Sequence, residues 1–155
     1  MKNPYFNPAK KHHRPDGFQN NYMSFRGKRW HEILRWRWQA WRAGHPRPIA
    51  TPIPMVPPDL AFIHANAQAG LAMQPAVTWI GHITVLAQIG GLNILTDPVF
   101  SDRCFPVQWA GPKRQTPPGL TLDQLPHIDV VLLSHNHYDH MDEGSLLALS
   151  IQTGG

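Results

Sequence analysis

The chain has 155 residues, of which 42% are hydrophobic, so it is long and apolar enough for one domain with a buried core. Its formal net charge is +4, and much of the positive charge falls in the first 50 residues, which favours an anionic partner there, either lipid headgroups or nucleic acid. Cys104 is the single cysteine, which excludes an internal disulfide and favours a reducing, cytoplasmic setting. No apolar run approaches the roughly 18 residues of a membrane-spanning helix, and the N-terminus lacks the apolar stretch of a secretory signal.

Residues 1–58 predict a basic, Trp/Arg- and Pro-rich N-terminal extension that carries one helix. Its first part, residues 1–27, is polar and rich in Pro, Asn and Gly, which is typical of an extended or disordered arm. Residues 28–43 predict a helix that ends at Gly44. The proline-rich residues 45–59 then support neither a helix nor a central strand, so we expect a connector.

One face of the 28–43 helix is apolar and is formed, at helical spacing, by Trp30, Ile33, Leu34, Trp38 and Trp41. Either this face packs on the following domain with Arg35 and Arg42 in solvent, or the helix lies in a membrane interface with its arginines on anionic lipid. Stacking of the tryptophans on nucleic acid bases is the weaker alternative, so we expect no nucleic-acid partner.

Residues 59–155 predict a domain of mixed α/β class. Asp59 is the expected N-cap of a short helix over residues 60–69. The pattern then changes to the alternating and β-branched residues typical of strands. Strands are expected at residues 77–80, 84–89 and 92–96, with Gly90-Gly91 as the turn of a hairpin.

A long loop over residues 101–119 separates these strands from one more strand and a helix. Thr121 is the expected cap of a short helical turn. The apolar run from residue 127 or 128 to residue 133 has the length of a strand, and its continuous apolar character predicts burial on both faces. Residues 143–151 predict the start of a helix.

Residues 135–140 read H-N-H-Y-D-H and place several metal-capable side chains directly after that strand. In an extended segment His135 and His137 point the same way, so they can converge on one ion. After a turn, Asp139 and His140 can reach a second ion beside it, and such a pair of metals clamps the attacking and leaving oxygens of a hydrolysed bond. The alternatives are a solvated histidine-rich loop and a site for a single ion.

The H-x-H-x-D-H motif after IDVVLLS resembles the metal motif of the metallo-β-lactamase superfamily. The upstream run VTWIGHITVLAQIGGLNILTDPVFSDR, followed by WAGPKRQTPPG, is similar to the N-acylphosphatidylethanolamine-hydrolysing phospholipase D family. This resemblance covers about residues 75–150. It implies an αββα sandwich (an α/β fold of the α+β sandwich type) whose first half lies in residues 59–155.

The resemblance also implies roles for single residues. His135 and His137 would hold a first Zn²⁺, and Asp139 and His140 would hold a second and act in catalysis. Tyr138 matches a position that contacts the lipid substrate.

Two further residues are candidates for support of the metal ligands. Asp97 matches a supporting position of the family, and from its own residue type it either tethers a ligand histidine or caps the loop before Pro98. His82, in a Gly-His pair, is either such a supporting residue or a hydrogen-bonded core histidine.

The family's activity implies a zinc-dependent phosphodiester hydrolase that releases N-acylethanolamine and phosphatidic acid from a phospholipid substrate. Its remaining ligands come from a second half, so we expect this chain to be an incomplete fragment with an apolar sheet face uncovered. The alternatives are another hydrolase of a small ester or phosphodiester, and a non-catalytic fragment that binds anionic membranes. The expected location is the cytoplasm; peripheral membrane contact through residues 28–43 and a homo-oligomer are left open.

Overall fold

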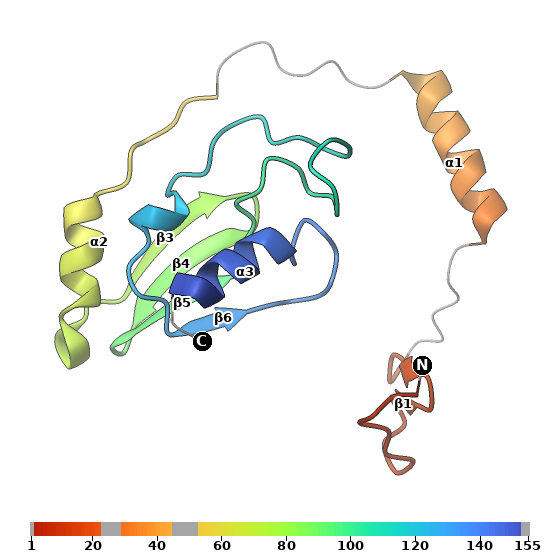
Figure 1. Cartoon of the computed structure of the whole chain (residues 1–155), viewed down its shortest axis with the longest axis horizontal. Helices are drawn as coiled ribbons and strands as arrows, with labels where there is room; N and C mark the ends of the chain where they lie inside the picture. Colours follow the sequence, from red (N-terminus) through yellow and green to blue (C-terminus); the bar gives the residue numbers. More distant parts are fainter. Residues whose placement is uncertain (1, 23–28, 45–52, 153–155) are drawn as a thin grey trace. The chain divides into compact units, whose positions relative to one another are not determined.

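The computed structural model describes residues 2–22, 29–44 and 53–152 (Figure 1). The chain divides into two compact units, residues 1–47 and residues 48–155. The domain boundary after residue 58 stays a prediction. Most of the proline-rich connector, residues 45–52, lies outside the described residues.

The first unit begins with a small turn-rich fold rather than the predicted extended or disordered arm. Strands β1 (His13–Arg14) and β2 (Gly17–Phe18) pair antiparallel. The Asn3 side chain donates to the carbonyls of Arg14 and Gly17 at 3.1 and 2.7 Å, which closes the turn between the strands. For the described part of this arm the prediction is therefore wrong. The Asn3 amide satisfies two backbone carbonyls of the turn, and amino-acid composition alone does not reveal such a contact.

Helix α1 (Trp30–Ala43) confirms the predicted tryptophan-rich helix. At its start the Glu32 carboxylate accepts from the Arg29 amide at 2.7 Å, which satisfies one of the unpaired N–H groups of the first turn. Gly44 follows the last helical residue with a φ of 74°, a conformation that favours glycine and ends the helix. Among the described residues, no helix is both long and apolar enough to cross a bilayer.

The second unit contains the mixed α/β structure predicted for it. In chain order its elements are α2 (Leu60–Ala67), η1 (Gly70–Ala72), β3 (Ala76–Gly81), β4 (Thr84–Ile89), β5 (Leu92–Thr96), η2 (Leu122–Gln124), β6 (Val130–Leu132) and α3 (Glu143–Gln152). The Asp59 side chain accepts from the Phe62 amide at 2.9 Å and so caps α2 as predicted. The hairpin turn is confirmed as well, since Gly90 and Gly91 have φ values of 61° and 84°.

Four strands form one sheet in the order β3-β4-β5-β6. The first three pair antiparallel, whereas β5 and β6 pair parallel, with Ile94 opposite Val130 and Thr96 opposite Leu132. The parallel pair needs a crossover, and residues 97–129 supply it. The carboxyl ends of β5 and β6 and the turn between β3 and β4 therefore meet at one edge of the sheet.

One face of the sheet packs against α2 and α3 around a core that includes Ile63, Leu86, Leu95, Leu120 and Leu149. This core also holds a polar network. The Gln88 amide donates to the Ile63 carbonyl and to the Asn93 side chain, both at 2.9 Å, and accepts from Asn66 at 3.3 Å. Asn93 in turn donates from its backbone to Asp129 at 2.7 Å, so the network joins α2, both strands of the hairpin and the segment before β6.

Gln88→Leu is expected to lower the free energy of unfolding by about 3 kcal/mol, because it leaves buried amide groups of the network without their partners. The exposed Gln115→Leu is the matched control and should change the unfolding free energy by less than about 0.5 kcal/mol. Urea denaturation followed by circular dichroism measures both. Equal unfolding midpoints for Gln88→Leu and the wild type would show that the network does not stabilise the fold.

The opposite face of the sheet carries exposed apolar side chains. Val77 and Trp79 of β3 are 74% and 70% exposed, and Leu132 of β6 is 52% exposed. This confirms the expectation of an uncovered apolar face. The prediction for the last strand, β6, was wrong in two respects. The strand is shorter than predicted, and it is not buried on both faces, because no second layer covers its outer side in the described part of the second unit.

Candidate metal centre

The sheet edge defined by the ends of β5 and β6 gathers most of the predicted site residues. Asp97 follows β5, and Ser134, two residues after β6, directly precedes the metal motif. The Asp97 amide donates to the Leu132 carbonyl at 2.8 Å, which extends the parallel pairing by one bond. A site at the carboxyl ends of parallel strands is the usual place for ligand binding in α/β sheets.

Asp97 is nearly buried, and its carboxylate is fully engaged. It accepts from the Ser134 amide at 2.7 Å, from the Ser134 hydroxyl at 2.8 Å and from His140 Nδ1 at 3.0 Å. Because a carboxylate only accepts, His140 carries its proton on Nδ1 and presents the lone pair of Nε2. Asp97 thus tethers a predicted ligand histidine, one of the two roles weighed for it.

Ser134 was not singled out in the sequence, yet it connects the site. Its hydroxyl donates to Asp97, so its oxygen is left to accept from His135 Nδ1 at 2.9 Å. This bond leaves the Nε2 lone pair of His135 directed at His137 Nδ1, 3.0 Å away. Two imidazoles on one tetrahedral zinc have nitrogens about 3.3 Å apart, so this pair fits a shared ion with a small adjustment.

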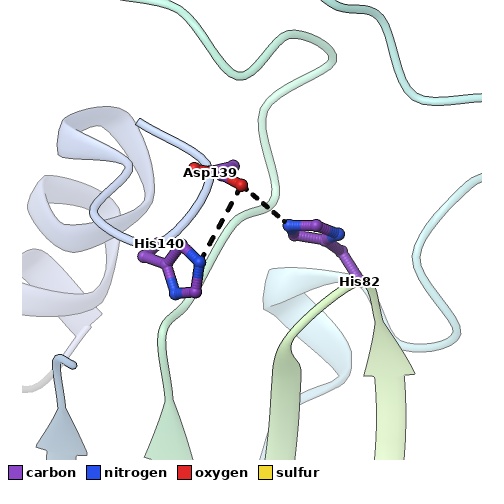
Figure 2. A group of neighbouring side chains, drawn as sticks. All are labelled: His82, Asp139 and His140. Carbon is purple, nitrogen blue, oxygen red and sulfur yellow. Dashed lines mark hydrogen bonds and ion pairs between the residues drawn. The ribbon is translucent and has the colours of Figure 1, made fainter. Parts of the chain in front are cut away.

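Asp139 lies between two histidines (Figure 2). Its Oδ2 is 3.2 Å from His82 Nε2 and 3.8 Å from His140 Nε2. Ligand-capable atoms of these three residues all lie within 4.8 Å of one another. His82 is exposed and contacts Asp139, a predicted metal ligand. The structure therefore excludes a buried core histidine and favours the alternative, a residue that supports the metal ligands.

The two carboxylates of the site favour their charged forms. Burial alone would raise the pKa of Asp97, but hydrogen bonds from Ser134 and His140 outweigh it and hold the pKa below its ordinary value. Burial opposes ionisation of Asp139 too, but hydrogen bonds, first from His82, and the charge of His140 lower its pKa. Carboxylates and imidazoles together are a donor set that zinc uses in proteins.

The backbone is strained at two residues of this edge. His82 and Asp97 have φ values of 50° and 36°, a region that residues with a Cβ seldom adopt. Such conformations cost on the order of 1–3 kcal/mol and gather at functional sites. In the two-residue turn between β3 and β4, this conformation carries His82 toward Asp139.

A second cluster fixes the segment after the metal motif. The Asp142 carboxylate accepts from the backbone and side chain of Ser101 at 3.0 and 2.9 Å and from the Ser145 hydroxyl. Ser145 accepts from the Phe100 amide at 2.8 Å. The loop after β5 is thereby bound to the start of α3, so both ends of the metal motif are anchored. Asp142 could have been suspected as a helix cap, since it precedes the expected helix.

The site opens on a cavity of about 1350 Å³. His82, His137 and Asp139 line it together with apolar side chains from the segment before α2, from β3 and from the residue after the metal motif: Ile53, Met55, Val56, Trp79 and Met141. Tyr138 lines it as well, with its ring 6.0 Å from that of Phe105. Cys104 also lies on the wall, where burial first and the charge of Asp139 next raise the pKa of its thiol.

Residues 92–153 match a β-lactamase superfamily domain, a stretch that runs from β5 through the metal motif and α3. The superfamily resemblance inferred from the motif is therefore confirmed. The mixed sheet with helices on one face is consistent with part of a metallo-β-lactamase fold.

Relatives of this superfamily region match over short segments. An uncharacterised protein of Mycobacterium tuberculosis (strain H37Rv) is 46% identical over 100 residues, 64% of this chain and 25% of the relative. N-acyl-phosphatidylethanolamine-hydrolyzing phospholipase D 1 of Caenorhabditis elegans is 49% identical over 65 residues, 42% of this chain and 18% of the relative. A metal-dependent hydrolase of Anaeromyxobacter sp. (strain K) is 35% identical over 79 residues, 50% of this chain and 24% of the relative. The chain thus spans about a quarter or less of the length of these relatives.

Proposed function

We propose that the protein is a metal-dependent hydrolase that cleaves a phosphodiester bond of N-acylated phosphatidylethanolamine, releasing N-acylethanolamine and phosphatidic acid. The observation that carries this proposal is the cluster of histidines and aspartates opening on a large cavity with apolar walls. An apolar cavity beside a polar reaction centre suits a substrate with acyl chains and a charged headgroup. The likeness to the Caenorhabditis elegans phospholipase D supports the same substrate class.

Under this proposal His135 and His137 would hold one zinc ion, and Asp139 and His140 would hold another. Bound zinc would supply Lewis-acid stabilisation of the negative charge that develops on the phosphoryl oxygens. The protein's own contribution is orientation. Asp97 accepts a hydrogen bond from Nδ1 of His140, and Ser134 accepts one from Nδ1 of His135, which leaves Nε2 of each ring free to bind metal.

Two other residues on the cavity wall have roles toward the substrate in this proposal. Tyr138 would contact the lipid. Lys113 would attract the phosphate, although Asp102 lies 3.8 Å from its ammonium group and offsets part of that charge.

The proposal is tested by incubating the zinc-loaded protein, in its full-length form, with vesicles that contain N-acylphosphatidylethanolamine and measuring N-acylethanolamine by mass spectrometry. Release is expected, and His135→Ala should reduce it to the level of the metal-free protein. The exposed His127→Ala is the control and should keep the wild-type rate. No release from protein with verified bound zinc would contradict the proposal.

A second candidate is the hydrolysis of a small, soluble ester or phosphodiester. The Anaeromyxobacter relative favours it, since the name of that protein, a metal-dependent hydrolase, specifies no lipid substrate. A panel of soluble esters and phosphodiesters separates the candidates, because a lipid hydrolase should turn over vesicles or micelles faster than any soluble member of the panel.

A further inference from the structure

Helix α1 of the first unit exposes an unusual amount of aromatic surface. The apolar face of α1 is defined here by side chains that recur at spacings of three or four residues along the helix: Trp30, Ile33, Leu34, Trp38 and Trp41. None of the helix residues is buried, and Trp30 and Trp41 are 72% and 74% exposed. The other residues of the first unit therefore leave this face open, although soluble proteins seldom expose a contiguous apolar patch without a binding role.

The charges beside this face are almost all positive. Arg35 and Arg42 lie beside it, and the single acid of the helix, Glu32, already accepts from the Arg29 amide at the N-terminus. The Arg42 guanidinium lies 5.3 Å from the centre of the Trp38 ring, so cation and aromatic ring occupy neighbouring positions at the edge of the face.

Arg37 lies within the apolar face, four residues after Ile33 and four before Trp41. An arginine at such a position can lay its aliphatic stem on apolar surroundings while its guanidinium reaches an anionic boundary. Aromatic rings, aliphatic groups and cations therefore lie on or beside the same side of α1, which is the composition of a helix that lies in a membrane interface.

We propose that α1 binds the surface of an anionic phospholipid bilayer, with its apolar face in the headgroup and acyl boundary and its arginines on lipid phosphates. The aliphatic Ile33 and Leu34 favour lipid over single-stranded nucleic acid, because base stacking uses aromatic rings but not aliphatic side chains. The cations favour lipid over a purely apolar protein surface. This binding needs no metal, so it stands independently of the proposed hydrolytic function.

The test uses the full chain with EDTA present and vesicles of phosphatidylcholine with or without phosphatidylglycerol. Four of the six tryptophans lie in α1, so intrinsic fluorescence reports mainly on this helix. A blue shift and quenching by brominated acyl chains are expected with anionic vesicles, and the affinity should fall as salt screens the charges. Equal affinity for neutral and anionic vesicles would overturn the proposal.

A charge-matched pair of double variants localises the effect. Arg35→Gln with Arg42→Gln is expected to weaken vesicle binding about 30-fold, at about 1 kcal/mol for each cation near the surface. Lys10→Gln with Lys11→Gln removes the same charge from an exposed part of the same unit and should weaken binding several-fold less. Equal losses in the two variants would show attraction by net charge rather than by α1.

The apolar contribution is tested with Trp41→Ala against the exposed Trp109→Ala of the second unit. Only Trp41→Ala should weaken binding, and circular dichroism verifies that the helix is retained. Preference for a single-stranded oligonucleotide over anionic vesicles would overturn the proposal in favour of nucleic-acid binding. Failure of this proposal is distinguishable from failure of the proposed hydrolysis, because hydrolysis can also be measured with the substrate in detergent micelles, where no bilayer is present.

Discussion

Asp97→Asn is expected to lower the free energy of unfolding by about 3 kcal/mol, because the amide cannot accept all the bonds that the carboxylate now receives from Ser134 and His140. Asparagine is the informative substitution, since it keeps the side-chain volume and tolerates the φ of 36° at this position. The loss therefore reports on hydrogen bonds and charge rather than on backbone strain. Chemical denaturation measures it.

The same substitution is expected to weaken zinc binding by about 10- to 100-fold, because an unsupported His140 ring no longer presents Nε2 in a fixed direction. Asp102→Asn is the matched control: its carboxylate is 69% exposed and pairs with Lys113 at 3.8 Å. That change should alter stability by less than about 0.5 kcal/mol. If both variants unfold alike, Asp97 does not anchor the site.

Asp139→Asn is expected to weaken zinc binding by at least about 100-fold, the equivalent of about 2.7 kcal/mol, because it removes the carboxylate placed between two histidines. Its effect on folding should be small, since Asp139 is about half exposed and lies outside the core. Competition with a chromophoric chelator measures the affinity.

His82 provides a graded comparison at the same carboxylate. His82→Ala should weaken zinc binding about tenfold through loss of the contact with Asp139. His127→Ala is the matched control, because His127 is also exposed and lies 3.8 Å from another carboxylate, that of Asp129. Identical zinc affinities of the His82 and His127 variants would remove His82 from the site.

Local signals in the sequence predicted most elements of the second unit. The Asp59 cap and the Gly90-Gly91 turn act within a few residues, so their consequences are visible without the fold. The same holds for the end of α1 at Gly44. Tertiary surroundings decided the remaining features: the burial of β6 depends on a layer over its outer face, and the β1–β2 hairpin depends on the single side chain of Asn3.

The site could be predicted only in part for a similar reason. The motif of residues 135–140 is contiguous, so its metal chemistry follows from residue types and spacing. The contact between His82 and Asp139 joins positions 57 residues apart, and no periodicity links them. Ser134 escaped notice because a serine after a strand has many ordinary roles, and only the folded chain places its hydroxyl among Asp97, His135 and His140.

The central claim is that the histidines and aspartates at this edge of the sheet form one metal site. Titration of the protein with zinc, followed by NMR of the imidazole nitrogens, tests it directly because the chain has ten histidines that report separately. The account predicts that the resonances of His135, His137 and His140 shift together while Nδ1 of His135 and His140 keeps its proton. Shifts confined to His12, His13 or His31, with the motif histidines unchanged, would contradict it.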